Sequence, residues 1–164
     1  MDDRRRARTS ERFEQRCAYC DVHEDDAGAT LTIDHHRPRA HDGDDEDDNL
    51  VYACPRCNDH KGSYWHEHDP PHVRLLHPLR DALADHLREE EDGRVLGITE
   101  EGIFFIRRLQ LNRTQLVAYR RGLRARQKLR EELAAALQLV HALEHRMNAL
   151  DASIDDATDD LERD

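Results

Sequence analysis

Residues 17–62 decide the fold of this chain. They contain its four cysteines, in the pairs Cys17-Ala18-Tyr19-Cys20 and Cys54-Pro55-Arg56-Cys57. Two pairs with this spacing are typical of a structural zinc site, in which four thiolates surround the metal. The sequence shows no signal-like stretch and no apolar run long enough to span a membrane, which predicts a cytoplasmic protein without a membrane partner. Because a reducing compartment disfavours disulfides, we expect the cysteines to bind Zn²⁺.

The composition indicates a small folded core with an extended appendage. Of 164 residues, 37% are hydrophobic and 37% are charged. Such a chain has little apolar material for a large core, so a stabilising metal ion and a long helix are plausible. The net charge of −11 argues against a protein that coats nucleic acid without specificity.

The charges are unevenly distributed along the chain. Arginines crowd residues 1–16, which predicts a basic arm at 1–12 that is disordered, or helical only on contact with a partner. Residues 102–130 contain nine basic residues and no acidic one. This second stretch could contact a nucleic-acid backbone or another protein. Acidic residues gather at 42–48, where they form a polar loop, and in a tail at 155–164.

The segment between the cysteine pairs predicts a strand, a loop, a second strand and a helix. Residues 31–33 are β-branched or apolar and read as a short strand, and residues 49–53 form the return strand. Residues 37–48 form the loop between them. Pro55 suits the first position of a helix that fades near Gly62. We therefore assign a small ββα domain to residues 13–70 and an α+β fold to the chain.

The remaining residues predict a mainly helical extension. In the connecting region 71–112, Asp92-Gly93 is a hairpin signal, and Thr99 could cap a short helix that buries Ile103, Phe104, Ile106 and Leu109. Residues 113–154 read as one long helix. Its apolar residues recur at alternating spacings of four and three, which predicts a coiled coil and a possible homo-oligomer through 129–154. These residues are Leu129, Leu133, Ala136, Val140, Leu143, Met147, Leu150 and Ile154. Leu137 and Leu139 widen the apolar face, so packing against the body or against another protein is also open.

The ββα segment carries the residue types that phosphodiester hydrolysis needs. The reaction requires an activated water and stabilisation of charge at the phosphate and at the leaving oxygen. A histidine can accept the proton, a hard divalent cation on oxygen ligands can stabilise the charge, and an asparagine can orient the base. The candidates, in chain order, are Asp34, His35, Asn49 and Asn58.

These residues, together with the two cysteine pairs and Lys61-Gly62, resemble the HNH endonuclease family. The resemblance implies a ββα-metal fold that cuts DNA, with RNA also possible, and His35 as general base positioned by Asn49. It implies that Asp34 and Asn58 hold a catalytic Mg²⁺ or Mn²⁺ ion. It also implies that Cys17, Cys20, Cys54 and Cys57 hold zinc away from the reaction.

One departure leaves the choice of base open. His36 stands where the family usually has an apolar residue, so His35 or His36 could be the base. Alternation along a strand places Asp34 and His36 on one face and His35 on the other, although a strand end would break that rule. The motif favours His35. Arg37, Arg56 and Lys61 are candidates for phosphate contacts.

A weaker resemblance covers parts of residues 75–120. Leu75-Leu76-His77-Pro78-Leu79 and Leu109-Gln110-Leu111-Asn112-Arg113 are similar to an extension of HNH proteins in bacterial anti-phage systems of the retron and Septu type. That similarity implies an ATPase partner and a role in defence. A non-catalytic zinc-knuckle module that binds nucleic acid is the alternative that the cysteines alone would allow.

Overall fold

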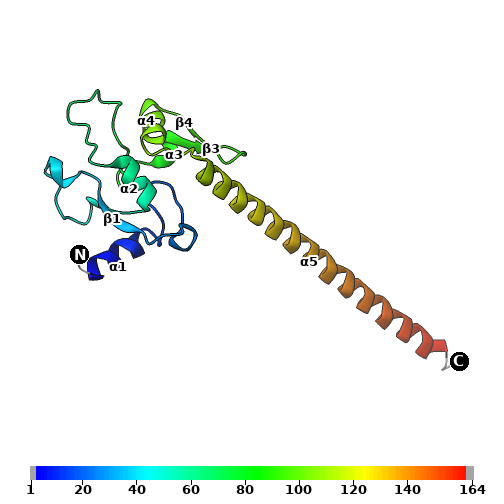
Figure 1. The fold of residues 1–164 in the computed structure, drawn as a ribbon. Helices are drawn as coiled ribbons and strands as arrows, with labels where there is room; N and C mark the ends of the chain where they lie inside the picture. Colours follow the sequence, from blue (N-terminus) through cyan, green and yellow to red (C-terminus); the bar gives the residue numbers. More distant parts are fainter. Residues whose placement is uncertain (1–2, 162–164) are drawn as a thin grey trace. The chain divides into compact units, whose positions relative to one another are not determined.

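The computed structural model describes residues 3–161, with side chains described as far as residue 149. The packing divides the chain into two units, Met1–Arg121 and Gly122–Asp164. Figure 1 traces the elements of both units in chain order. The predicted domain at 13–70 and connecting region at 71–112 lie together in the first unit.

An antiparallel hairpin and a helix form the centre of the first unit. Strand β1 (Thr32–His35) pairs with β2 (Leu50–Ala53), with Asp34 opposite Val51 and His35 opposite Leu50. Helix α2 (Pro55–Lys61) follows directly, because Pro55 supplies a preset φ at its first position. Two single 3₁₀ turns, η1 (Glu24–Asp26) and η2 (Arg39–His41), shape the loops before and after β1. The ββα arrangement and the α+β class are as predicted.

The N-terminal residues form a helix where the sequence predicted a basic arm without structure of its own. Helix α1 (Asp3–Arg12) packs against both strands of the hairpin. Arg6 donates hydrogen bonds to the hydroxyl of Tyr52 at 2.8 Å and to Glu24 at 2.7 Å, and Arg12 donates to the carbonyl of Leu50. The arginines that suggested a solvated arm therefore attach this helix to the domain.

A second, smaller group of elements follows α2. It contains α3 (Leu83–His86), an antiparallel hairpin of β3 (Leu87–Glu89) and β4 (Val95–Gly97), and α4 (Glu100–Arg108). Thr99 caps α4 as predicted, with its hydroxyl accepting from the amide of Gly102 at 3.1 Å. The predicted burial was only partly right. Leu109 is fully buried, Phe104 and Ile106 are partly buried, and Ile103 is 47% exposed. Phe105, which was not predicted to be buried, is fully buried.

One hydrophobic core joins both groups of elements in the first unit. It contains residues of the cysteine pairs, of β2, of the segment after α2 and of α4. Its largest buried apolar side chains are Leu31, Tyr52, Leu75, Leu76, Phe105, Leu109 and Leu111. The connecting region is therefore part of the core that supports the hairpin.

Helix α5 (Thr114–Leu161) begins in the first unit and forms the described part of the second. Leu116 and Arg120 are buried in the first unit, whereas every described side chain from residue 124 to 149 is exposed. The side chains of Leu150, Ile154 and the predicted acidic tail at 155–164 lie outside the described residues. None of the helices described has the length and apolar character needed to cross a membrane.

Candidate active site

The four cysteines converge on one buried point. The hairpin and the start of α2 bring the two pairs together, and the four Sγ atoms lie within 4.8 Å of one another. None of the four cysteines forms a disulfide. A tetrahedron with metal–sulfur bonds of about 2.3 Å has sulfur–sulfur edges of about 3.8 Å. The Sγ atoms of Cys20 and Cys54 are 3.8 Å apart, so the cluster is positioned to bind a metal ion and its chemistry fits zinc.

Positive charge borders the cysteine cluster. The guanidinium of Arg113 lies 3.7 Å from the sulfur of Cys57 and 3.9 Å from that of Cys54. Hydrogen bonds among the four thiols lower the pKa of Cys54 and raise that of Cys57. Four thiolates around Zn²⁺ leave two negative charges in excess. Arg113 is placed to offset part of that charge.

Asp34 lies at the end of β1 in an almost closed environment. Its Oδ2 accepts a hydrogen bond from the hydroxyl of Tyr19 at 2.7 Å, and its Oδ1 pairs with the ammonium of Lys61 at 3.1 Å. Burial raises the pKa of this carboxyl group, and the charge of Lys61 opposes the rise. Tyr19 stands between the two cysteines of the first pair, so the zinc site and this carboxylate are directly connected. Nothing in the sequence predicted this hydrogen bond from Tyr19 to Asp34.

Lys61 was expected to be a surface contact for phosphate, and the structure places it inside the domain. Its side chain is 1% exposed, and its ammonium donates to the carbonyl of His35 at 2.7 Å as well as to Asp34. A buried ammonium needs such partners, because desolvation of an unpaired charge costs several kcal/mol. Lys61 therefore joins the end of α2 to the end of β1, and it is not available on the surface.

His35 faces the acidic loop. Its Nε2 lies 2.7 Å from Oδ1 of Asp45, and Asp45 also accepts two hydrogen bonds from Arg39 at 2.6 and 2.9 Å. Arg5 of α1 adds a third partner to this carboxylate at 3.1 Å. The bonds from His35 and Arg39 hold the pKa of Asp45 well below its usual range. The His35 side chain remains 17% exposed, so solvent reaches the ring.

His36 turns in the opposite direction, into the body of the domain. It is 3% exposed, and its ring lies 4.3 Å from that of His77 and 6.0 Å from that of Trp65, measured between centroids. Burial, followed by the charge of His77, lowers the pKa of His36 to about 3. His77 itself accepts a hydrogen bond at Nδ1 from the amide of Leu79, which requires that Nδ1 carry no proton.

Asn49 closes the loop between the strands at its base. Its side-chain oxygen accepts from the amide of Arg37 at 2.8 Å, and its amide group donates to the carbonyls of Arg37 and Asp44 at 3.1 and 2.8 Å. Its backbone carbonyl accepts from the amide of His36 at 2.8 Å. Asn49 thus fixes the residues that follow His35 and the residue that precedes Asp45.

The other predicted site residues differ in their exposure. Asn58 lies on α2 and is partly exposed, and Arg56 on the same helix is exposed. Arg37 is partly buried, with its guanidinium 5.5 Å from the centroid of the Trp65 ring and a hydrogen bond to the carbonyl of His41. Arg56 is therefore the most exposed of the three basic candidates.

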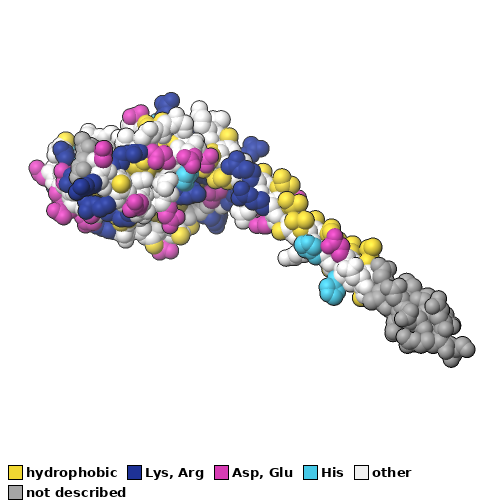
Figure 2. All heavy atoms as spheres, turned by 90° about the horizontal axis from the view of Figure 1, so that it is seen from below, with side chains coloured by type: hydrophobic (Ala, Val, Ile, Leu, Met, Phe, Trp, Pro, Cys, Tyr) yellow, Lys and Arg dark blue, Asp and Glu magenta, His cyan; other side chains and the backbone are white. Residues whose placement is uncertain are grey.

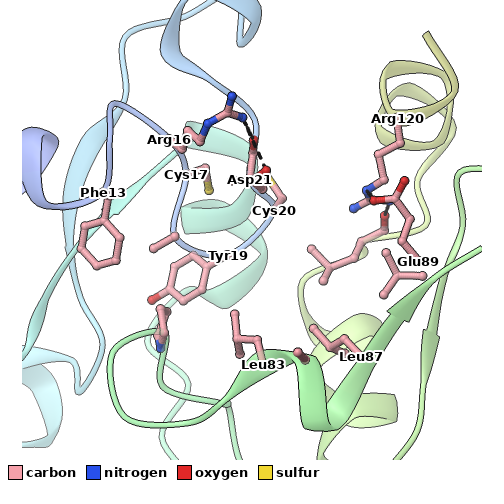
Figure 3. A pocket seen from close by; sticks show the side chains of 15 residues that line it. Phe13, Arg16, Cys17, Tyr19, Cys20, Asp21, Leu83, Leu87, Glu89 and Arg120 are labelled. Atoms are coloured by element: carbon pink, nitrogen blue, oxygen red, sulfur yellow. Dashed lines mark hydrogen bonds and ion pairs between the residues drawn. The ribbon is translucent and has the colours of Figure 1, made fainter. Parts of the chain in front are cut away.

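A separate pocket of about 600 Å³ opens beside the first cysteine pair (Figure 3). Tyr19, Leu83 and Leu87 line it together with two ion pairs, Arg16 with Asp21 and Arg120 with Glu89. Its lining includes neither Asp34 nor His35. The candidate site therefore does not coincide with this pocket.

Two residues of the site carry no signal in the sequence. Asp45 is one of many acidic residues in its loop, and Arg39 lies in the same polar stretch. Only the fold of the loop, fixed by Asn49 and the turn η2, brings their side chains to His35.

Comparison with known proteins matches part of the chain. Residues 17–64 match the family model of the HNH endonuclease. No curated protein and no solved structure matches the chain. The matched residues contain both cysteine pairs, the hairpin and α2. Residues 17–64, with their strand, loop, strand and helix around a cysteine cluster of the zinc type, are therefore similar to the HNH endonucleases, a similarity that indicates a metal-dependent nuclease.

Proposed function

We propose that this protein hydrolyses DNA phosphodiester bonds and that His35 is the general base. The observation that carries the proposal is the contact between Nε2 of His35 and Oδ1 of Asp45 at 2.7 Å. Nε2 of His35 also lies 3.2 Å from Nε of Arg39, a contact that would need an acceptor on the ring, but the ionised carboxylate of Asp45 can only accept, so we assign the proton to Nε2. The lone pair of Nδ1 is then left to accept a proton from water. The partial exposure of His35 supports the same role, since a general base must meet its water and its substrate.

His36 is the weaker candidate for the base. Its buried ring packs against His77 and Trp65, away from solvent. We assign it to packing.

Asp34 and Asn58 are the residues that would hold a divalent ion. Carboxylate and amide oxygens are the donors that Mg²⁺ and Mn²⁺ take. Each oxygen of Asp34 accepts one hydrogen bond and keeps capacity for a further partner. When bound, the ion supplies positive charge for the phosphate and the leaving oxygen. Asn49 supports the reaction indirectly, by holding the backbone on both sides of the loop.

Cleavage of supercoiled plasmid in the presence of Mg²⁺ or Mn²⁺ tests the proposal. We expect His35→Ala to lower the rate by about 10²–10⁴-fold, the usual contribution of a general base. His68→Ala is the matched control, because His68 is an exposed histidine outside the matched residues and should leave the rate unchanged. Equal far-ultraviolet circular dichroism of both variants would show that folding is preserved. Undiminished cleavage by His35→Ala would refute the assignment of the base.

The substrate and the biological setting belong to the same proposal. DNA is the substrate class that we favour, with RNA as the alternative to be tried in the same assay. The similarity of residues 75–79 and 109–113 to anti-phage HNH proteins supports a role in defence beside an ATPase. If the purified protein is inactive and cleaves only after such an ATPase is added, the partner is required. If no ion and no partner elicits cleavage while the protein still binds nucleic acid, the zinc-knuckle module is the better description.

A further inference from the structure

An apolar face on α5 has no cover among the described residues of its own unit. Between residues 129 and 147, large apolar side chains occupy the predicted coiled-coil positions, here called the seam, and the positions on either side of them, here called the flanks. All of these side chains are between 47% and 65% exposed. They are Leu129, Leu133, Leu137, Leu139, Val140, Leu143 and Met147. Figure 2 shows hydrophobic side chains along this part of the helix. A single helix gains nothing from such a stripe in water, so the stripe indicates a second surface that covers it.

The heptad register fixes which side chains flank the seam. Positions a are Leu133, Val140 and Met147, and positions d are Leu129, Ala136 and Leu143. The flanking positions e are Arg130, Leu137 and Glu144, and the flanking positions g are Glu132, Leu139 and Arg146. In a coiled coil these flanks decide the partner and the orientation.

A parallel pair of these helices would match its flanks poorly. Position g of one helix then faces the position e that lies five residues later on the other. Glu132 would face Leu137, and Leu139 would face Glu144, so each pair would place a carboxylate against an apolar side chain. Only Arg146, facing Asp151, would gain an opposite charge.

An antiparallel pair centred on Gln138 matches every flank. In this orientation a faces d, e faces e and g faces g. Arg130 then faces Glu144 and Glu132 faces Arg146, each twice because of the twofold symmetry. Leu137 and Leu139 each face their own copies, so charge meets opposite charge and leucine meets leucine.

The layers of the seam also fit this arrangement. They pair Leu129 with Met147, Leu133 with Leu143, and Ala136 with Val140. The small Ala136 allows the two helices to approach closely at the centre. There the leucines at 137 and 139 can close the interface on both sides, which explains why the apolar face is widest at this point.

We propose that residues 129–147 form a twofold antiparallel coiled coil with a second copy of this chain, centred on Gln138. The surface supplies an apolar seam and flanks that are complementary to themselves. Glu132 lies 3.9 Å from Lys128 of its own helix, an exposed pair of low value that can give way to Arg146 of the second copy. The proposal does not depend on the nuclease activity.

Charge reversal at the g positions tests both the pairing and its direction. The full-length, zinc-loaded protein is studied by sedimentation equilibrium, and the wild type should be a dimer. Glu132→Arg and Arg146→Glu should each raise the dimer Kd about tenfold, because attractive pairs become repulsive. The double variant Glu132→Arg/Arg146→Glu should return Kd to near the wild-type value. In a parallel pair, the double variant would stay weakened, since the glutamate at 146 would face Asp151.

A matched control separates these effects from changes in the helix itself. Glu131 is next to Glu132 but lies at the outward position f, so Glu131→Arg should leave Kd unchanged. Val140→Asp places a charge in the central layers and should give monomers of unchanged helicity by circular dichroism. A monomeric wild type at every concentration, a dimer that survives Val140→Asp, or a double variant that is not restored would each overturn the proposal.

Discussion

Replacing Lys61 by methionine should destabilise the first unit strongly, although the lysine is not a member of the proposed catalytic group. The Lys61 side chain is 1% exposed, and its ammonium donates to Oδ1 of Asp34 at 3.1 Å and to the carbonyl of His35 at 2.7 Å. Its loss leaves a carboxylate that is 8% exposed and still bonded by the hydroxyl of Tyr19, but no longer paired with a cation. Breaking a buried ion pair by removing one partner costs about 3–5 kcal/mol. That is a large share of the roughly 5–15 kcal/mol by which small domains are stable.

Urea unfolding of the zinc-loaded protein, followed by circular dichroism, measures this loss. Arg56→Met is the matched control, since Arg56 is an exposed basic residue on the same helix and its replacement should cost less than about 0.5 kcal/mol. The double variant Asp34→Asn/Lys61→Met should cost less than the sum of the single variants, because the asparagine leaves no uncompensated charge. A cost of under about 1 kcal/mol for Lys61→Met, or strict additivity in the double variant, would refute the reasoning.

Two further variants test the surroundings of the site. Replacing Arg113 by alanine removes the guanidinium that lies 3.7 Å from the sulfur of Cys57, and should speed zinc release to a colorimetric chelator about tenfold. An unchanged release rate would exclude a role for its charge. Burial, followed by the charge of Arg80, lowers the pKa of His77, so below pH of about 6.5 the unfolded chain binds a proton that the folded chain does not. The free energy of unfolding should therefore fall as the pH drops below about 6.5, by up to about 1.4 kcal/mol per pH unit. Urea unfolding midpoints measured at pH values above and below about 6.5 should show this fall in the wild type and a smaller fall in His77→Asn. A slope that is the same in wild type and variant would exclude His77 as the source.

The sequence was sufficient for the elements whose signals are local. Proline after Cys54, glycine at 62 and threonine at 99 mark helix ends by their own backbone or side-chain chemistry, and the structure ends or begins helices beside each of them. The convergence of the cysteines followed from their spacing alone. The helix ends do not depend on contacts between distant residues, and the cysteine cluster, which does, is marked by the paired spacing of its ligands.

The misses involve contacts that local sequence patterns do not reveal. The sequence predicted that the arginines of α1 are solvated, because their partners lie far from them in the chain. These partners are Glu24, Tyr52 and the carbonyl of Leu50. Lys61 was predicted to contact phosphate on the surface, because the hydrophobic periodicity of the sequence does not show how α2 lies against β1. Asp45 had no mark to distinguish it from the other acidic residues of its loop.

The bonds made by Asn49 have a consequence for how the segment can change during evolution. One side chain ties the amide and carbonyl of Arg37 to the carbonyl of Asp44, so the loop is closed at its base, independently of what lies between. Lengthening a closed loop is cheap, since each doubling costs only about 0.6 kcal/mol of chain entropy. Insertions between Arg37 and Asp44 would therefore leave the hairpin and the zinc cluster nearly undisturbed, although they would displace Arg39 from Asp45. This short stretch is where descendants of the protein could acquire new contacts to a substrate without rebuilding the domain.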